Sequence, residues 1–163
     1  MKKTVIFVVG MQCAGKTVLT GTLANSGASV CCIGEEIRKK IDVTSFEDAE
    51  NPYAPQITEA FAQQAIRDAI KEFKLNDKSL LVIDSAPRNE YQYLIIKNML
   101  VKDEVLVIFV YEKYDVRLKR AIKKYDGKLS YFMKRESFEN DWLKILENHC
   151  IGEHVNYITV GEK

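Results

Sequence analysis

The sequence lacks a strong excess of charge of either sign and lacks any long apolar run. Its 163 residues include 24 Lys and Arg against 23 Asp and Glu, a formal net charge of +1, which argues against a surface built throughout for nucleic acid. The apolar stretch nearest the start, residues 4–9, is too short for a membrane span or a secretory signal, and it runs directly into a glycine-bearing loop. We therefore expect no membrane association and interpret residues 4–9 as a buried strand.

The cysteines are few, and they exclude two further classes of protein. The four of them show neither the CxxC spacing of a zinc site nor the density of a disulfide scaffold. This pattern predicts a reducing environment and hence a cytoplasmic protein. Internal repeats and low-complexity segments are also missing, while 47% hydrophobic and 29% charged residues are typical of a globular protein. A chain of this length fits one domain, and we expect residues 1–163 to form it.

Short apolar runs alternate with helical patterns along the chain. The runs are continuous and rich in β-branched and aromatic residues, which is typical of parallel strands covered on both faces. They lie at residues 4–9, 29–33, 80–84, 105–111 and 155–160. Helices are predicted between them, at residues 17–25, 56–74, 91–100, 115–124 and 130–148. This alternation predicts an α/β domain of three layers with right-handed crossovers.

Three features stand apart from this pattern. Residues 42–55 are polar and hold two of the three prolines, which indicates a loop that can move over a site. Residues 125–129 lie in a basic neighbourhood and predict a short lid or turn. In the last predicted helix one stripe consists of Phe138, Trp142, Ile145 and Leu146. We interpret the stripe as core, with a base-stacking surface as the alternative.

The segment GMQCAGKT contains the most specific motif of the sequence. Gly10, Gly15, Lys16 and Thr17 satisfy GxxxxGK[ST], in which backbone N–H groups cradle phosphates, the lysine reaches the β and γ oxygens, and the hydroxyl holds Mg²⁺. The motif follows an apolar strand and opens a predicted helix, whose N-terminus favours anions. It predicts binding of ATP with Mg²⁺. The predicted nucleotide-binding residues are Gly10, Gln12, Cys13, Ala14, Gly15, Lys16, Thr17 and Val18.

Asp84 ends the buried run LLVID, at the sheet edge where α/β folds present their ligands. A carboxylate at this edge could hold Mg²⁺ through water, beside Thr17. The alternative is an aspartate that caps a turn. Because the phosphate-binding loop is present, we favour the metal role for Asp84 and Thr17.

Two further segments resemble those of the nucleoside monophosphate kinases, the family of adenylate kinase and its relatives, including dephospho-coenzyme A kinase. CIGEEIR, ending at Arg38, resembles the family's G-D-x-x-R, with Glu35 in place of Asp. DSAPRNEYQ, residues 84–92, resembles D-G-F-P-R-x-x-x-Q, with Ser85 in place of Gly. The resemblance implies a P-loop NTPase fold with a five-stranded parallel sheet of order 2-3-1-4-5 and a short lid. It also implies an acceptor-binding segment at about residues 34–75. The residues expected to bind the acceptor are Glu35 and Arg38, in this segment, and Arg88 and Gln92, after the third strand.

The same resemblance implies a lid that carries arginines, within about residues 113–136. Arg117 and Arg120 fall in the helix after the fourth strand, and KRESFE resembles the segment that closes the family's lid, with Arg135 as a phosphate contact. Phosphoryl transfer depends mostly on positioning and on neutralising charge, so arginines facing the loop lysine suit an anionic acceptor. The predicted catalytic residues are Lys16, Glu35, Arg88, Arg117, Arg120 and Arg135.

The sequence does not decide the identity of the acceptor. The first interpretation is a kinase that transfers the γ-phosphoryl group of ATP to a nucleotide or a nucleotide-like small molecule. In the second the acceptor is a hydroxyl, which benefits from a base such as Glu35; dephospho-coenzyme A, a nucleoside, or a hydroxymethylated pyrimidine in DNA, as in viral DNA modification, would qualify. Nucleic acid is a partner only in this last case. A nucleotide-dependent switch is the third interpretation, although the Asn/Thr-Lys-x-Asp motif for guanine is missing.

Overall fold

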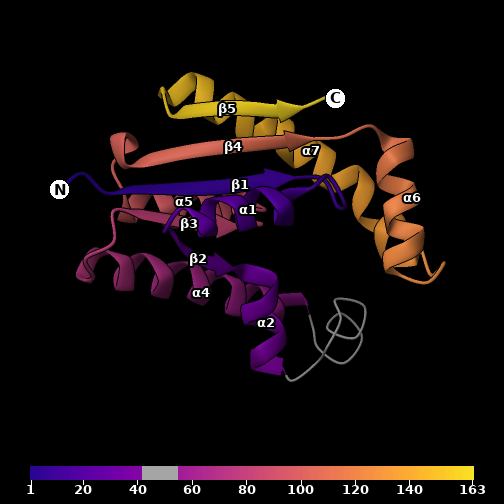
Figure 1. Cartoon of the computed structure of the whole chain (residues 1–163), viewed down its shortest axis with the longest axis horizontal. Helices are drawn as coiled ribbons and strands as arrows, with labels where there is room; N and C mark the ends of the chain where they lie inside the picture. The colour runs from indigo at the N-terminus through magenta and orange to yellow at the C-terminus, as the bar shows by residue number, and fades with distance from the viewer. Residues whose placement is uncertain (42–54) are drawn as a thin grey trace.

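Five parallel strands form one sheet in the order β2-β3-β1-β4-β5, which confirms the predicted order (Figure 1). The computed structural model describes residues 1–41 and 55–163. The strands are β1 (Thr4–Gly10), β2 (Ser29–Cys32), β3 (Leu80–Asp84), β4 (Val105–Tyr111) and β5 (Asn156–Gly161). The helices are α1 (Lys16–Asn25), α2 (Ile33–Ile41), α4 (Pro55–Leu75), α5 (Glu90–Met99), α6 (Tyr114–Lys124) and α7 (Ser130–Glu153), with a 3₁₀ turn η1 (Lys102–Glu104).

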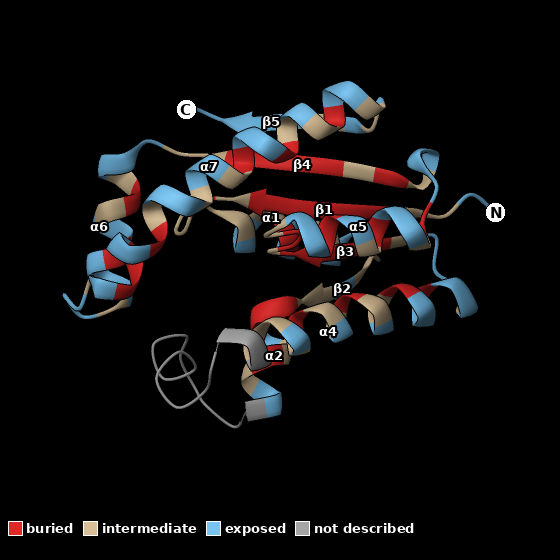
Figure 2. Cartoon of the chain, turned by 180° about the vertical axis from the view of Figure 1, so that it is seen from behind, coloured by how far each residue is buried: buried red, intermediate tan, exposed pale blue. Residues whose placement is uncertain are grey.

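The central strand β1 separates two hydrophobic cores, and this gives the three predicted layers. Val5, Phe7 and Val9 pack on one face of the sheet with apolar residues of α4, α5 and α7. Ile6 and Val8 pack on the other face, under α1. Because successive side chains of a strand point to opposite faces, the continuous apolar run of β1 fills both cores. Figure 2 shows β1 buried along most of its length.

The two edge strands differ from the prediction that every strand is covered on both faces. In β5, Ile158 and Val160 are 48% and 41% exposed, and in β2 Val30 is 42% exposed. Among the described residues α1 is the helix that packs on this side of the sheet. One helix cannot cover five strands, so the two edge strands stay partly exposed (Figure 2).

Two helices also depart from the predicted pattern. Helix α2 begins directly after β2, where the sequence predicts the end of a strand, and its Ile33 and Ile37 join the larger core. Helix α7 continues to Glu153, beyond the predicted end at residue 148. The apolar stripe of α7 is only partly core, because Leu146 is buried whereas Phe138 and Ile145 are 55% and 46% exposed.

The remaining predictions concern connecting segments. The proposed mobile loop at 42–55 lies, up to residue 54, outside the described residues. Residues 125–129 form a turn between α6 and α7, in which Gly127 has a φ of +77°. None of the described helices is both long and apolar enough to cross a membrane.

Candidate active site

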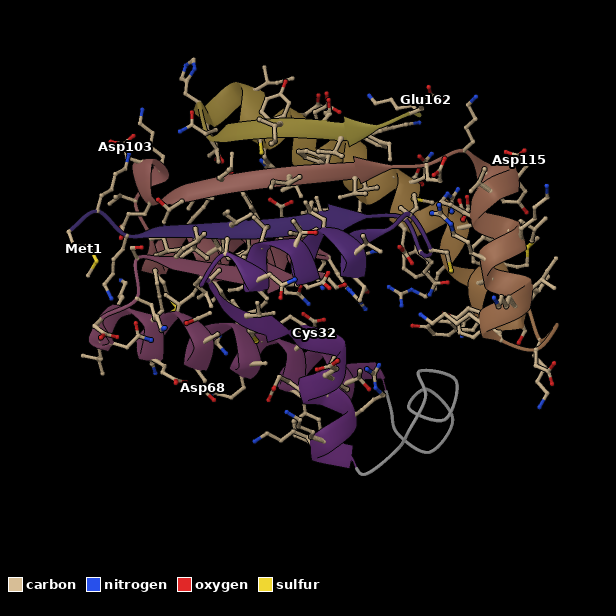
Figure 3. All side chains as sticks on the ribbon, viewed as in Figure 1. Met1, Cys32, Asp68, Asp103, Asp115 and Glu162 are labelled. Carbon is tan, nitrogen blue, oxygen red and sulfur yellow. The ribbon has the colours of Figure 1, made fainter. Side chains whose placement is uncertain are left out.

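A cleft of about 1310 Å³ opens at the carboxyl ends of the strands. The loop between β1 and α1, the start of α2, the segment after β3 and the facing sides of α6 and α7 line it. Figure 1 shows α6 and the first turns of α7 beyond the ends of β1 and β4, and Figure 3 marks Cys32, which lines the cleft at the end of β2. The topology therefore gathers the predicted phosphate-binding, metal and acceptor segments around one space.

The backbone of the phosphate-binding loop requires its two motif glycines. A Cβ on Gly10 would lie 2.5 Å from the carbonyl oxygen of Val110 in β4, a contact that the sheet cannot relieve. Gly15 has a φ of +103°, which glycine adopts without steric cost. Helix α1 begins immediately afterwards at Lys16, so its free N–H groups face the loop. The loop thus has the shape and the dipole that suit an anion.

The Lys16 ammonium lies inside this loop. Its Nζ donates hydrogen bonds to the carbonyl oxygens of Gly10, at 2.8 Å, and Met11, at 3.0 Å. Burial lowers the pKa of Lys16 to about 8, and the carboxylate of Glu139 partly opposes this effect. A lysine held in this way keeps its charge at neutral pH but loses it within a mildly alkaline range.

This lowered pKa predicts a pH-dependent affinity for triphosphate. Only the ammonium form attracts phosphate oxygens, and the fraction of that form falls as the pH rises through about 8. We expect the dissociation constant for ATP to be nearly constant below this pH and to rise by up to about tenfold per pH unit above it. Equilibrium titration with a fluorescent ATP analogue measures it.

The Lys16→Arg variant is the control for this titration, because a guanidinium keeps its charge throughout the range. The rise should disappear in that variant, whatever its absolute affinity. An identical rise in Lys16→Arg and in the unchanged protein would assign the pH dependence to another group.

Asp84 lies at the end of β3, paired in register with Val8 of β1 and Cys32 of β2. It is only 4% exposed and lines the cleft. The hydroxyl of Ser85 donates to its Oδ1 at 3.1 Å. Ser85 itself has a φ of +69°, so the residue that replaces the family's glycine keeps the left-handed backbone that glycine favours.

The few protein oxygens available at this site suit Mg²⁺ better than a metal ion whose ligands all come from the protein. Among the residues described, no group of three or more His, Cys, Asp and Glu side chains could hold an ion. Mg²⁺ commonly uses one or two protein oxygens and completes its shell with phosphate oxygens and water. The Asp84 carboxylate and the Thr17 hydroxyl, which both line the cleft, fit that requirement.

Among the residues predicted to bind an acceptor, Glu35 and Arg38 extend from the first two turns of α2, and both line the cleft. Arg88 reaches the cleft from the segment after β3, where its Nε donates to the Ser85 carbonyl oxygen at 2.9 Å. Burial, followed by the nearby charge of Arg135, lowers the pKa of the Arg88 guanidinium. The positive charges of Lys16, Arg88 and Arg135 thus lie within electrostatic range of one another, which favours an anionic occupant.

Gln92 differs from the prediction that it contacts the acceptor. It is 1% exposed and is absent from the cleft wall. Its Oε1 accepts from the backbone N–H of Arg88 at 2.8 Å, and its Nε2 donates to the Glu59 carboxylate of α4 at 3.0 Å. Gln92 therefore fixes the segment that carries Arg88.

The two arginines of α6 lie in different surroundings. Arg117 is 4% exposed, forms two hydrogen bonds with Glu136 at 2.5 and 3.0 Å, and does not line the cleft. Arg117 was predicted to contact phosphate, whereas in the structure it forms an ion pair with Glu136 that links α6 to α7. Arg120 lines the cleft, and its Nη1 donates to the Cys13 carbonyl oxygen at 3.0 Å. Both side chains reach the phosphate-binding loop, since Arg117 also donates to the Gln12 carbonyl oxygen at 3.4 Å.

Helix α7 contributes Arg135, one of the residues predicted to contact phosphate, and Glu139, which was not predicted. Arg135 is buried and Glu139 is partly buried, and both line the cleft, with Arg135 Nε 2.7 Å from Glu139 Oε1. Arg135 also donates to the hydroxyl of Tyr131. Their spacing of four residues on a predicted helix was the available signal for this pair. Glu139 is also the anion that most raises the pKa of Lys16, so it balances the positive charge around the loop.

Comparisons with known proteins show the fold. No family model and no curated protein matches the chain. The chain is similar to shikimate kinase from Acinetobacter baumannii in complex with shikimate, with 20% identity and a TM-score of 0.60 over 99% of this chain and 84% of that one. It is also similar to shikimate kinase from Bacteroides thetaiotaomicron, with 13% identity and a TM-score of 0.60 over 97% and 85%.

This chain has the fold of the P-loop kinases. At these identities the likeness establishes the fold alone. The fold agrees with the resemblance to nucleoside monophosphate kinases that the motifs carry.

Proposed function

We propose that the protein is an ATP- and Mg²⁺-dependent phosphotransferase that transfers the γ-phosphoryl group to a small anionic acceptor. The observation that carries the proposal is the common cleft, which is lined by the phosphate-binding loop with Lys16 and also by Arg38 and Arg88. Phosphoryl transfer requires a donor and an acceptor to be held in line while negative charge is neutralised. The loop would hold the phosphate donor, and the arginines would hold the acceptor and neutralise negative charge.

Each residue then has a defined part. The loop backbone and Lys16 would hold the β- and γ-phosphates, and Lys16 would stabilise the charge that develops on the transferring group. Mg²⁺, held by Thr17 and Asp84, supplies further positive charge when bound. Arg120 and Arg135 would approach the transferring phosphate from the lid segment, residues 113–136. Arg117 and Gln92 would act through their neighbours, by fixing α6 and Arg88.

Two acceptors fit this arrangement. A nucleotide would present its phosphate to Arg38 and Arg88, which can hold phosphate oxygens in pairs. The second candidate is a hydroxyl acceptor, and two observations favour it: Glu35 lines the cleft, and the chain has the fold of shikimate kinases, one of them in complex with shikimate, which carries hydroxyls. In that case Glu35 would accept the proton of the attacking hydroxyl.

A labelling screen tests the proposed activity. The purified chain is incubated with Mg²⁺ and γ-³²P-ATP against nucleoside monophosphates, nucleosides, dephospho-coenzyme A, shikimate and DNA containing hydroxymethylated pyrimidine. We expect label on one class of acceptor and none with a Lys16→Ala control. ATP binding without transfer to any of them would favour the nucleotide-dependent switch.

Removing the charge of Asp84 should raise the Mg²⁺ requirement. Asp84→Asn keeps the shape of the side chain, but a neutral amide is a weaker ligand for a hard cation. We expect the Mg²⁺ concentration that gives half-maximal affinity for a fluorescent ADP analogue to rise by about tenfold or more, the scale on which a metal's outer partners act. An unchanged Mg²⁺ dependence in a folded variant would show that Asp84 does not bind the metal and would favour the alternative that it caps a turn.

A further inference from the structure

A carboxylate of α7, that of Glu139, lies near the lysine to which the proposed function assigns the phosphates. It lines the cleft, and its charge acts on Lys16 more strongly than the charge of Asp84 does. Asp84 has a part in the proposed chemistry as a ligand of Mg²⁺. The steps described above give no part to Glu139, although a negative charge at this position opposes the binding of an anion.

Most of the charged groups around Glu139 are cations, and they come from several elements. On α7 itself, Arg135 lies one turn earlier, with its Nε 2.7 Å from Glu139 Oε1. The groups of other elements within electrostatic range of Glu139 are Lys16 of the loop, Arg88 after β3, Arg117 of α6 and Tyr125 after α6. The carboxylate therefore lies among the cations that suit a phosphate, and the two would compete for them.

The contacts of Glu139 suggest that it can be displaced. Its Oε1 atom is buried, yet in the described part of the chain no donor is aligned for a hydrogen bond with this atom. The Nη1 of Arg135 donates instead to the hydroxyl of Tyr131. Aligned, charge-assisted hydrogen bonds contribute most of the strength of an arginine–carboxylate pair. Glu139 is thus held mainly by attraction between charges, and a more highly charged anion can take its place beside Arg135.

We propose that Glu139 is an internal anion that competes with the phosphates of the ligand for Arg135 and Lys16. The proposal rests on the proposed function and identifies a residue that sets the affinity of that site. A phosphate on the loop brings like charge close to Glu139, which is unfavourable at short range. Arg135 would then exchange the carboxylate for phosphate oxygens, which can accept its N–H groups in pairs. Glu139 acts through these cations and is therefore a positioning residue.

Removing the charge of Glu139 should strengthen the binding of a polyphosphate. Glu139→Gln keeps the size of the side chain, and we expect the dissociation constant for tripolyphosphate to fall by about tenfold or more. Tripolyphosphate is the probe because it carries the charge of ATP without the base or the sugar. Isothermal titration calorimetry at one fixed ionic strength measures the change, since salt screens the effect. Glu139→Asp keeps the charge and should resemble the unchanged protein more than it resembles Glu139→Gln.

The sign of the change distinguishes competition from a purely structural role. If Glu139 only oriented Arg135, Glu139→Gln would weaken the binding of tripolyphosphate, as Arg135→Ala should. Unchanged or weaker binding by a folded Glu139→Gln protein would therefore overturn the proposal. Glu139→Ala should give a gain of the same sign and replaces the glutamine variant if that variant does not fold.

Asp141→Asn is the matched control for the change in net charge. It converts a carboxylate to an amide on the same helix, but Asp141 is exposed and does not line the cleft. Its affinity for tripolyphosphate should equal that of the unchanged protein. An equal gain in Asp141→Asn and Glu139→Gln would assign the effect to the net charge of the protein and would also overturn the proposal.

Arg135 supplies a second measurement through a double-mutant cycle. Arg135→Ala should cost more affinity for tripolyphosphate in the Glu139→Gln background than in the protein that keeps Glu139. The reason is that Arg135 has to give up its carboxylate only where Glu139 is present. Equal losses in the two backgrounds would show that Glu139 and the polyphosphate do not compete for Arg135.

Lys16→Ala keeps the failure of this proposal distinguishable from the failure of the proposed function. If tripolyphosphate and ATP bind in a Lys16-dependent manner but no more tightly to Glu139→Gln, the internal-anion proposal is wrong and the phosphotransferase proposal stands. If neither ligand binds to the unchanged protein or to Glu139→Gln, the proposed function itself fails. Tighter, Lys16-dependent binding to Glu139→Gln supports both.

Discussion

Replacement of Lys16 by alanine should lower the rate of phosphoryl transfer by roughly 10²–10³-fold, the range found when one preorganised charge-stabilising contact is removed. The ammonium lies within the phosphate-binding loop, bonded to the Gly10 and Met11 carbonyl oxygens at 2.8 and 3.0 Å. It is therefore within reach of any phosphate that this loop binds. Steady-state kinetics with labelled ATP, on the acceptor found by the screen, measure the effect.

The same bonds mean that Lys16→Ala also removes two contacts within the loop. Circular dichroism and ATP affinity are therefore measured beside the rate, so that a collapsed loop is distinguished from a lost catalytic charge. Lys71→Ala, an exposed change on α4, is the control and should leave the rate unaltered. Transfer at near the normal rate by a folded Lys16→Ala protein would contradict the assignment of the loop as the donor site.

Local patterns in the sequence were sufficient to predict the central strands of the sheet. β1, β3 and β4 are continuous apolar runs, and such runs are stable as central strands, where both faces are covered. The sequence predicts β2 and β5 in the same way, yet they lie at the edges and stay partly exposed. Whether an apolar strand lies at the centre or at an edge depends on which strands pair with it, and no local pattern carries that information.

The site was predictable where a motif fixes the backbone, and less so where long side chains choose between partners. Gly10 and Gly15 are required by the loop shape itself, and both lie where the motif predicts. Arg117 and Gln92 have alternative partners, Glu136 and Glu59, which come close only in the folded chain. Phe138 was interpreted as core because helical spacing does not distinguish a core from the wall of a cleft.

A comparison of Glu35 with Arg88 should separate the two acceptors, and it is expected to give the largest single difference. For a hydroxyl acceptor, Glu35→Gln should lower kcat by roughly 10²–10⁴-fold, the range of general base catalysis, and the acidic limb of the pH–rate profile should disappear. For a phosphate acceptor, Arg88→Ala should raise KM and lower kcat sharply, because paired contacts to phosphate oxygens are lost, while Glu35→Gln should matter less.

Each variant has a close control in the same part of the chain. Glu36 follows Glu35 in the first turn of α2 but pairs with Lys39 at 3.3 Å and does not line the large cleft, so Glu36→Gln makes the same charge change away from the site. Arg88→Lys keeps the positive charge but not the planar fork, so a loss shared with Arg88→Ala would identify paired binding rather than charge alone. If Glu35→Gln and Arg88→Ala were both silent in folded protein, the acceptor would bind elsewhere, and the resemblance at these two positions would have no functional meaning.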